Sequence, residues 1–447
     1  MNDTIVAVAT ASGVGSVAIV RLSGYKALDI AKKLTKKETF TPRYAHLCSL
    51  YNQDNELIDE AIVIWFKAPH SFTTEDVVEF QCHGGFMVAK KILETTLFYG
   101  ARLAEPGEFT RRAFLGGRID LTEAEAIAKL IEAKSDEAVK ILAKQMKGEL
   151  REFVDDIKEL LLKAIAFTEV VIDYAEEDLP DNIVDDIIHQ LENIELKISR
   201  IVSSSERRRG MIDGFKVSIV GKPNVGKSSL LNAILGYERA IVSDIAGTTR
   251  DTIEEQIRVG SHLVRIVDTA GIREVSDTIE KIGIKRSIAA INQSDIVIVI
   301  FDASRAWDKE DDQILSLIER YGKNKEVIVA LSKVDLPKKI DIKKIEQFNP
   351  LQLSKEDRVE KILFELEKRL SQMTQGDELL LISTRQIEAV RRAKSAISQA
   401  KEPLLMGELE IFAFHINEAI LAISSISKPV DFNDIMDKMF SEFCLGK

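Results

Sequence analysis

The chain has 447 residues, of which 45% are hydrophobic and 30% are charged, and its formal net charge is −11. This length excludes a single hydrophobic core, and the composition excludes a disordered chain, so we expect two or three folded domains. The net negative charge argues against nucleic-acid binding over the whole surface. The three scattered cysteines indicate a reducing compartment, and no apolar run is long enough to cross a bilayer. We therefore expect a cytoplasmic protein.

Residues 1–117 predict a mixed α/β domain. Short β-rich runs alternate there with turn residues and with two amphipathic stretches. The expected strands are 5–9, 16–22, 61–66 and 77–81, and the expected helices are 27–34 and 89–98.

Residues 118–210 and 376–447 predict an all-α domain made of two separate segments. The sequence Thr122–Glu125 has the form of a capping box, and a long helix is expected over 183–201. The polar stretch 203–210 is interpreted as a turn-rich boundary. Helices are also expected over 379–400 and 404–424, although periodicity alone does not show that the two segments pack together.

Residues 211–375 predict an inserted domain with a parallel sheet. Almost entirely apolar runs at 215–220, 263–267, 296–301 and 327–331 are typical of strands buried on both faces. The run 252–259 alternates apolar and polar residues, as an edge strand does. The predicted fold class is therefore multidomain, with an N-terminal α/β domain, a discontinuous helical domain and an inserted P-loop α/β domain.

The sequence Gly221–Ser228 reads GKPNVGKS and lies between a predicted strand and a helix expected over 229–235, with Gly236 as its stop. A strand, a tight loop and a helix start place backbone N–H groups around a phosphate. In such a loop Lys227 would reach the β- and γ-phosphates, and the hydroxyl of Ser228 would hold magnesium.

Further motifs indicate GTP hydrolysis. Asp268 and Gly271 follow a strand and suit the magnesium shell and the γ-phosphate, and Thr249 would complete that shell. Asp335 can accept two N–H bonds from guanine, and Ser354 begins a base-contacting loop. The predicted GTP-binding residues are Asn224, Val225, Gly226, Lys227, Ser228, Ser229, Asp268, Thr269, Ala270, Gly271, Lys333, Asp335 and Ser354.

Two departures from a common GTPase pattern stand out. Ser332 occupies the place of the asparagine that usually ties the guanine-reading loop to the phosphate loop, and because serine is shorter we expect somewhat weaker guanine binding. Ile272 occupies the place of a glutamine that orients the attacking water in Ras-like proteins. Another polar group must do this, and Arg273, Glu274 and Glu280 are the nearby candidates.

The chain resembles the MnmE (TrmE) family of bacterial tRNA-modification GTPases over essentially its full length. The resemblance rests on these strings: GKPNVGKSSLL (221–231), DIAGTTRD (244–251), DTAGIR (268–273), AEPGEF (104–109), TRRA (110–113), DLTEAEA (120–126) and the terminal CLGK (444–447). The N-terminal strings and the terminal Cys-x-Gly-Lys make the resemblance specific, because the GTPase motifs alone fit several bacterial relatives.

The resemblance implies a Ras-like GTPase domain and an N-terminal domain that binds a tetrahydrofolate derivative and forms a homodimer. Folate-contacting positions are Arg21, Glu79 and Arg118, where lysine is more usual at the last. Potassium would be held by Asn224, helped by Ser243, Ile245 and Thr248, and would replace an arginine finger. Glu280 would position the attacking water, and Lys227 and Arg273 are the other catalytic candidates. The terminal motif has Cys444 near the folate and ends at Lys447.

The resemblance also implies a reaction and a partner. The reaction would add a carboxymethylaminomethyl or aminomethyl group to carbon 5 of the tRNA wobble uridine, with a one-carbon unit from the folate. The flavoprotein MnmG (GidA) would form a heterotetramer with this chain and would carry FAD and NADH. The alternative is a ribosome-assembly or RNA-binding GTPase switch, but that would predict an appended basic RNA-binding module, and this chain has only short basic clusters.

Overall fold

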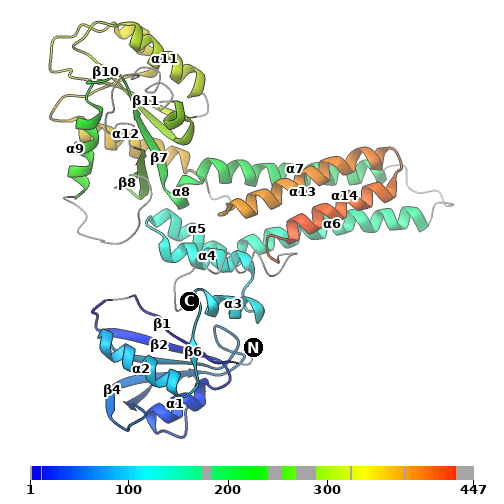
Figure 1. The fold of residues 1–447 in the computed structure, drawn as a ribbon. Helices are drawn as coiled ribbons and strands as arrows, with labels where there is room; N and C mark the ends of the chain where they lie inside the picture. The colour runs from blue at the N-terminus through cyan, green and yellow to red at the C-terminus, as the bar shows by residue number, and fades with distance from the viewer. Residues whose placement is uncertain are drawn as a thin grey trace, which may run out of the picture. The chain divides into compact units, whose positions relative to one another are not determined.

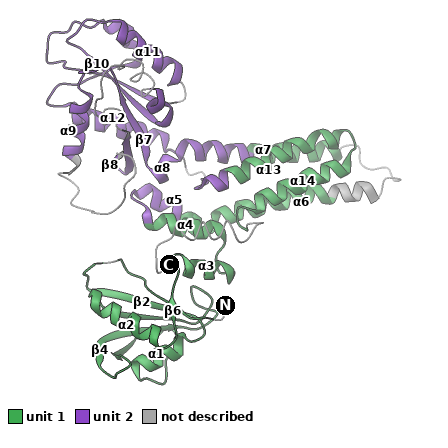
Figure 2. Ribbon diagram, viewed as in Figure 1, with its two compact units in different colours: residues 1–131, 144–196, 388–447 green, residues 132–143, 197–387 purple. Residues whose placement is uncertain are grey.

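The computed structural model describes residues 3–11, 13–173, 183–239, 254–267, 288–322, 325–376 and 379–428. The chain divides into two compact units (Figure 2): unit 1 contains 1–131, 144–196 and 388–447, and unit 2 contains 132–143 and 197–387. Within the described ranges no helix combines the length and apolar content needed to span a bilayer.

Unit 1 begins with a six-stranded sheet in the order β3-β4-β5-β2-β1-β6. All neighbouring strands are antiparallel except β1 and β6. The strands are β1 (Ile5–Val8), β2 (Val17–Ser23), β3 (His46–Tyr51), β4 (Leu57–Phe66), β5 (Val77–His83) and β6 (Arg102–Leu103), and the helices α1 (Ala27–Thr35) and α2 (Phe86–Phe98) accompany them (Figure 1). Their buried side chains, among them Val20, Leu22 and Phe80, share one core.

The four predicted strands and both predicted helices of this region are confirmed, and β3 and the two-residue strand β6 were missed. His46, Cys48 and Ser49 give β3 little β-branched character, and its strand form comes from pairing with β4, where Cys48 lies opposite Ala61. Strand β4 follows β3 after the short connection 52–56, so the two strands form a hairpin, and β3 was missed because its own residues carry no strong strand pattern.

A buried ionic network joins the N-terminal segment to α3 (Glu108–Leu115). The side chain of Arg112 is only 1% exposed, and it donates to Asp3 Oδ1 at 2.8 Å, Glu75 Oε2 at 2.9 Å and Glu108 Oε1 at 2.9 Å. Arg102 adds bonds of 2.8 and 2.6 Å to the two carboxylate oxygens of Glu108. Burial alone would raise the pKa of Glu108, but these donors and the backbone N–H of Glu105 lower it.

The rest of unit 1 is helical. Its helices are α4 (Leu121–Glu132), α6 (Glu149–Asp173), α14 (Leu409–Ser424) and large parts of α7 (Ile183–Arg208) and α13 (Thr384–Leu405). Helix α14 packs against α6, and Lys401 of α13 donates to Glu195 of α7 at 2.5 Å. The two helical segments separated in sequence therefore do pack together.

The capping box before α4 lies two residues earlier than predicted. Asp120 Oδ1 accepts from the Glu123 backbone N–H at 2.9 Å, and Glu123 Oε2 accepts from the Asp120 N–H at 2.7 Å. Thr122 is inside the helix and donates its hydroxyl to Asp120. The predicted Thr122–Glu125 box was wrong because Asp120 is an equally good N-cap residue that stands at the true helix start.

Unit 2 contains a second six-stranded sheet, in the order β12-β11-β10-β7-β9-β8. All neighbours are parallel except the edge strand β8, which runs antiparallel to β9 and confirms the prediction of an edge strand. The strands are β7 (Phe215–Val220), β8 (Glu254–Val259), β9 (His262–Val267), β10 (Ile296–Asp302), β11 (Glu326–Ser332) and β12 (Leu351–Gln352).

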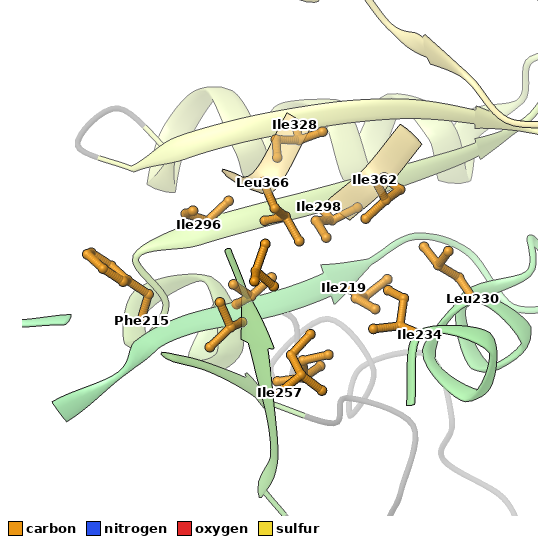
Figure 3. Packing of buried hydrophobic residues seen from close by; sticks show 14 of the residues in the cluster. Phe215, Ile219, Leu230, Ile234, Ile257, Ile296, Ile298, Ile328, Ile362 and Leu366 are labelled. Atoms are coloured by element: carbon orange, nitrogen blue, oxygen red, sulfur yellow. The ribbon is translucent and has the colours of Figure 1, made fainter. Parts of the chain in front are cut away.

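The helices of unit 2 include α8 (Gly210–Asp213), α9 (Lys227–Arg239), α11 (Lys309–Tyr321) and α12 (Arg358–Met373), and α5 (Asp136–Met146) begins in this unit. Figure 3 shows side chains of the sheet, among them Ile219, Ile298 and Ile328, packed with Leu230 of α9 and Ile362 of α12. A parallel sheet covered by helices is thus confirmed.

Two local predictions in unit 2 were wrong. The polar stretch 203–210 is not a turn: α7 continues to Arg208, because Ser205 is buried and bonded to Ile201 O and to the Leu381 N–H, and Arg208 donates to the carbonyls of Gln375 and Gly376. Helix α9 begins at Lys227 and runs past Gly236 to Arg239. A single glycine inside a helix costs only about 1 kcal/mol, so it did not stop this one.

Candidate functional site

The phosphate-binding loop predicted from GKPNVGKS connects β7 to α9. Lys227 and Ser228 stand in the first turn of α9, where backbone N–H groups have no partner inside the helix. Asn224 and Gly226 both have left-handed backbones, with φ of 63° and 106°. The loop therefore has the curvature and the free amide donors that a phosphate group needs.

The ammonium of Lys227 is aimed into this loop. Its Nζ donates to the carbonyls of Gly221 at 2.8 Å and Lys222 at 2.6 Å. Burial lowers the pKa of Lys227, because the charged form is poorly solvated there. An anionic phosphate beside it would restore favourable solvation of the charge, so the loop is electrostatically prepared for an anion.

A cavity of about 350 Å³ adjoins the loop at the carboxyl ends of β10, β11 and β12. Parallel sheets bind their ligands at this edge. The cavity brings together three sequence-predicted groups: Val225, Gly226 and Ser229 of the phosphate loop and α9, Lys333 and Asp335 after β11, and Ser354 after β12. Lys355 and Arg358 also line it.

Ser332 ties the two loops together despite its short side chain. Its hydroxyl donates to Val225 O at 2.7 Å and lies 3.2 Å from Phe301 O. The serine therefore reaches the phosphate loop although its side chain is shorter than that of asparagine. Whether guanine binds more weakly remains a prediction.

Lys333 makes a second link between the loops. Its Nζ lies 2.6 Å from Asp302 Oδ2 and 3.2 Å from the carbonyl of Asn224. Burial would raise the pKa of Asp302, but the bonds from Lys333 and Ser304 outweigh it and lower that pKa. The buried carboxylate thus stays charged and fixes the lysine across the mouth of the phosphate loop.

The loop after β12 is shaped by Asp357. Its Oδ1 accepts from the backbone N–H of Ser354 at 2.9 Å and from the Ser354 hydroxyl at 2.7 Å. Bonds from Lys361 and Ser354 lower the pKa of Asp357 to about 2. Because Asp357 engages both donors of Ser354, these bonds hold the shape of this loop beside the cavity.

The three residues that were predicted to contact folate lie in unit 1. Arg21 and Glu79 are directly opposite each other on β2 and β5, and Arg21 Nε donates to Glu79 Oε1 at 2.8 Å. The Arg21 guanidinium lies 5.7 Å from the centre of the Phe109 ring. Arg118 follows α3 in the connection to α4, and its side chain is exposed. Arg21 and Glu79 therefore form an ion pair in the structure. The ring of Phe109 lies next to this pair, although sequence reasoning did not single it out.

Several predicted residues lie outside the described part of the chain: Ser243, Ile245, Thr248, Thr249, Asp268, Thr269, Ala270, Gly271, Arg273, Glu280, Cys444 and Lys447. The magnesium, potassium and water-positioning roles of these residues thus remain predictions.

Comparisons with known proteins agree over the whole chain. The family described as "GTP-binding protein TrmE N-terminus" matches residues 4–118, and the family described as "MnmE helical domain" matches residues 121–444. The tRNA modification GTPase MnmE of Sulfurovum sp. is 60% identical over 447 residues, covering 100% of this chain and 99% of that protein. The protein of the same name from Sulfurimonas denitrificans is 58% identical over 446 residues, covering 100% of both.

Two similar solved structures each match part of the chain. The G domain of the T. maritima FeoB iron transporter has a TM-score of 0.26 and 23% identity, covering 36% of this chain and 99% of that one. Era in complex with MgGDPNP and a fragment of 16S ribosomal RNA has a TM-score of 0.26 and 24% identity, covering 41% of this chain and 66% of that one.

Proposed function

Because this chain belongs to the MnmE family of tRNA modification GTPases, a GTP-hydrolysing family, we propose that it couples potassium-activated GTP hydrolysis to modification of the tRNA wobble uridine. The reaction adds a carboxymethylaminomethyl or aminomethyl group to carbon 5, with a one-carbon unit from a tetrahydrofolate. The observation that carries the GTP assignment is the cavity in which Asp335 shares a wall with the phosphate loop.

In this proposal the cations are held by hard oxygen donors. Ser228, Thr249 and Asp268 hold magnesium, and Asn224 holds potassium with Ser243, Ile245 and Thr248. The amide and carbonyl oxygens of the second set suit an alkali ion. Two features of the structure support the role of Asn224: its left-handed backbone and the bond from Lys333 to its carbonyl hold its main chain in place. When bound, potassium supplies positive charge beside the phosphates, and Glu280, with Lys227 and Arg273 nearby, orients water.

We expect potassium to raise GTP hydrolysis by about tenfold or more over sodium at equal ionic strength, because one added positive contact at developing charge is commonly worth 10²–10³ in rate. The measurement is phosphate release by the full chain in KCl and in NaCl. The matched control is Asn224→Ala, which should keep GDP binding and lose the preference for potassium. Equal wild-type rates in the two salts would exclude the cation mechanism.

The N-terminal domain is proposed to bind a tetrahydrofolate derivative through Arg21, Glu79 and Arg118. A guanidinium suits the carboxylates of the folate tail, and a carboxylate suits the N–H donors of the pterin ring. The Arg21–Glu79 pair supports this, because its charges are held in place but remain partly exposed, at 23% and 15%.

Folate binding should raise the melting temperature of the chain, since a ligand at 100 times its Kd stabilises by about 2.7 kcal/mol. We expect 5-formyltetrahydrofolate to do this for the wild type and not for Arg21→Met. Arg43→Met is the control, because Arg43 is an exposed arginine of the same domain that donates to His70 O. A shift of equal size in Arg21→Met would remove Arg21 from the site.

The remaining proposals concern organisation. The domains are 1–117, 118–210 with 376–447, and 211–375. The chain forms a homodimer in the cytoplasm and a heterotetramer with the flavoprotein MnmG (GidA), which carries FAD and NADH, and the complex acts on tRNA. The terminal motif with Cys444 and Lys447 lies beside the folate.

A further inference from the structure

Lys222, the second residue of the phosphate loop, is a buried cation. Its side chain is only 8% exposed, and Nζ lies 2.8 Å from Asp308 Oδ2 and 2.7 Å from Asp311 Oδ2. Burial opposes the charged form, but the bonds that Lys222 donates to the two carboxylates outweigh it and raise the pKa of Lys222 above its usual value. Such a charge is stable only with well-placed partners, so this triad is a specific feature of the fold.

The two carboxylates are themselves fixed. Asp308 is the N-cap of α11, and its Oδ1 accepts from the backbone N–H groups of Glu310 at 2.9 Å and Asp311 at 3.3 Å. Asp311 Oδ2 accepts in return from the Asp308 N–H at 3.1 Å. The buried Ile318 anchors the same helix to the sheet core. Lys222 is therefore bonded to the capped N-terminal end of α11, through the buried Asp311 and the more exposed Asp308.

The main chain of Lys222 connects this anchor to the phosphate site. Its carbonyl is the acceptor that lies 2.6 Å from Lys227 Nζ. The preceding Gly221 passes so close to β10 that an added Cβ would lie 2.5 Å from the Ile300 carbonyl. Three contacts thus hold the first two residues of the loop. Strand β10 packs closely against Gly221, the carboxylates at the start of α11 bind the Lys222 side chain, and the Lys227 ammonium binds the Lys222 carbonyl.

We propose that Lys222, braced by Asp308 and Asp311, is a positioning residue for GTP hydrolysis that holds the start of the phosphate loop and the Lys227 ammonium in register with the triphosphate. This inference rests on the proposed assignment of 221–228 as the phosphate site. Catalysis by positioning is steep in distance, so a displacement of about 1 Å costs as much as 100-fold in rate. The competing explanation is that the triad only stabilises the domain.

A single substitution would not separate these explanations, because Lys222→Met leaves Asp311 buried without a cation. The double variant Lys222→Met/Asp311→Asn removes both buried charges and keeps an oxygen that can accept from the Asp308 N–H. Replacing a whole buried ion pair is often neutral for stability. This variant therefore tests positioning in a protein expected to stay folded.

The experiment measures kcat and KM for GTP in the full chain, below the melting transition of each variant. The double variant is expected to lose about tenfold to 100-fold in kcat, and Lys222→Arg, which keeps the charge, is expected to recover most of it. A kcat within twofold of wild type in the double variant overturns the proposal, and so does an arginine variant as slow as the double variant. Lys344→Met, which breaks an exposed pair with Asp312 on the same helix, is the control.

Lys227→Ala separates failure of this inference from failure of the site assignment. Loss of GTP binding in Lys227→Ala, with normal kcat in the double variant, overturns only the positioning role of Lys222. Normal GTP binding in Lys227→Ala overturns the phosphate-site assignment and, with it, the positioning role of Lys222.

Discussion

Replacing Asp335 with asparagine is expected to weaken GTP binding by about 10² to 10⁴-fold, because two hydrogen bonds to a charged group, each worth roughly 1.5–3 kcal/mol, are lost or reversed. Guanine presents two neighbouring N–H donors, and the carboxylate of Asp335 in the cavity is suited to accept both. Xanthine presents one donor and one acceptor, which asparagine can match. Titration calorimetry with GTP and with xanthosine triphosphate should show that the variant prefers the latter.

Asp341→Asn is the matched control for this change. Asp341 caps the short 3₁₀ helix Ile342–Lys344 and accepts from the Lys343 N–H at 3.3 Å, and it does not line the cavity. It should bind GTP as the wild type does. Retention of full GTP affinity in Asp335→Asn would mean that the base is read elsewhere.

Replacing Arg112 with methionine is expected to destabilise the N-terminal domain by about 3–5 kcal/mol, the usual cost of removing one partner from a buried ion pair. Glu75 would lose its bond from Arg112, and Glu108, with a side chain only 6% exposed, would lose one of its two arginines. Hydrogen-exchange mass spectrometry of the full chain should show faster exchange in peptides that cover β1 and α3. Lys90→Met, which breaks an exposed pair with Glu94, should leave that exchange unchanged.

The pH dependence of the Arg112→Met effect follows from Glu108. Its pKa in the native protein is lowered, so its contribution to stability is present above the unfolded pKa and is lost as pH falls through the folded pKa. Without Arg112 the pKa of Glu108 rises, because one of the donors that lowers it is lost. The difference between wild type and variant should therefore be largest at neutral pH and shrink below about pH 4; a constant difference would contradict this account.

The sequence predicted those parts of the fold that depend on local patterns. Apolar runs located β7, β10 and β11, and alternation located the edge strand β8. The prediction failed where contacts outside the segment decide the structure. Strand β3 forms by pairing with β4 in a hairpin, and the polar end of α7 is helical because Ser205 and Arg208 find partners beyond residue 370.

In the candidate site too, local motifs were predicted and contacts between separate segments were missed. GKPNVGKS and the run Ser332–Asp335 were recognised because the chemistry of each motif is written in consecutive residues. The bonds of Lys222 to Asp308 and Asp311 were missed because the partners are separated by more than 80 positions and each alone resembles a solvated surface charge. Likewise, nothing in AEPGEF or TRRA indicates that Arg112 is buried among three carboxylates.

The hydroxyl of Ser332 has a consequence for how the cavity can distinguish purines. A hydroxyl carries one proton, and the shortest contact of this one is to Val225 O. An asparagine would bring two amide protons and could serve the backbone and an imidazole ring nitrogen of the base together. If guanine lies as proposed, with its pyrimidine edge towards Asp335, the Ser332 side chain leaves no proton for N7. We therefore expect a nucleotide with carbon in place of N7 to lose no affinity at this position.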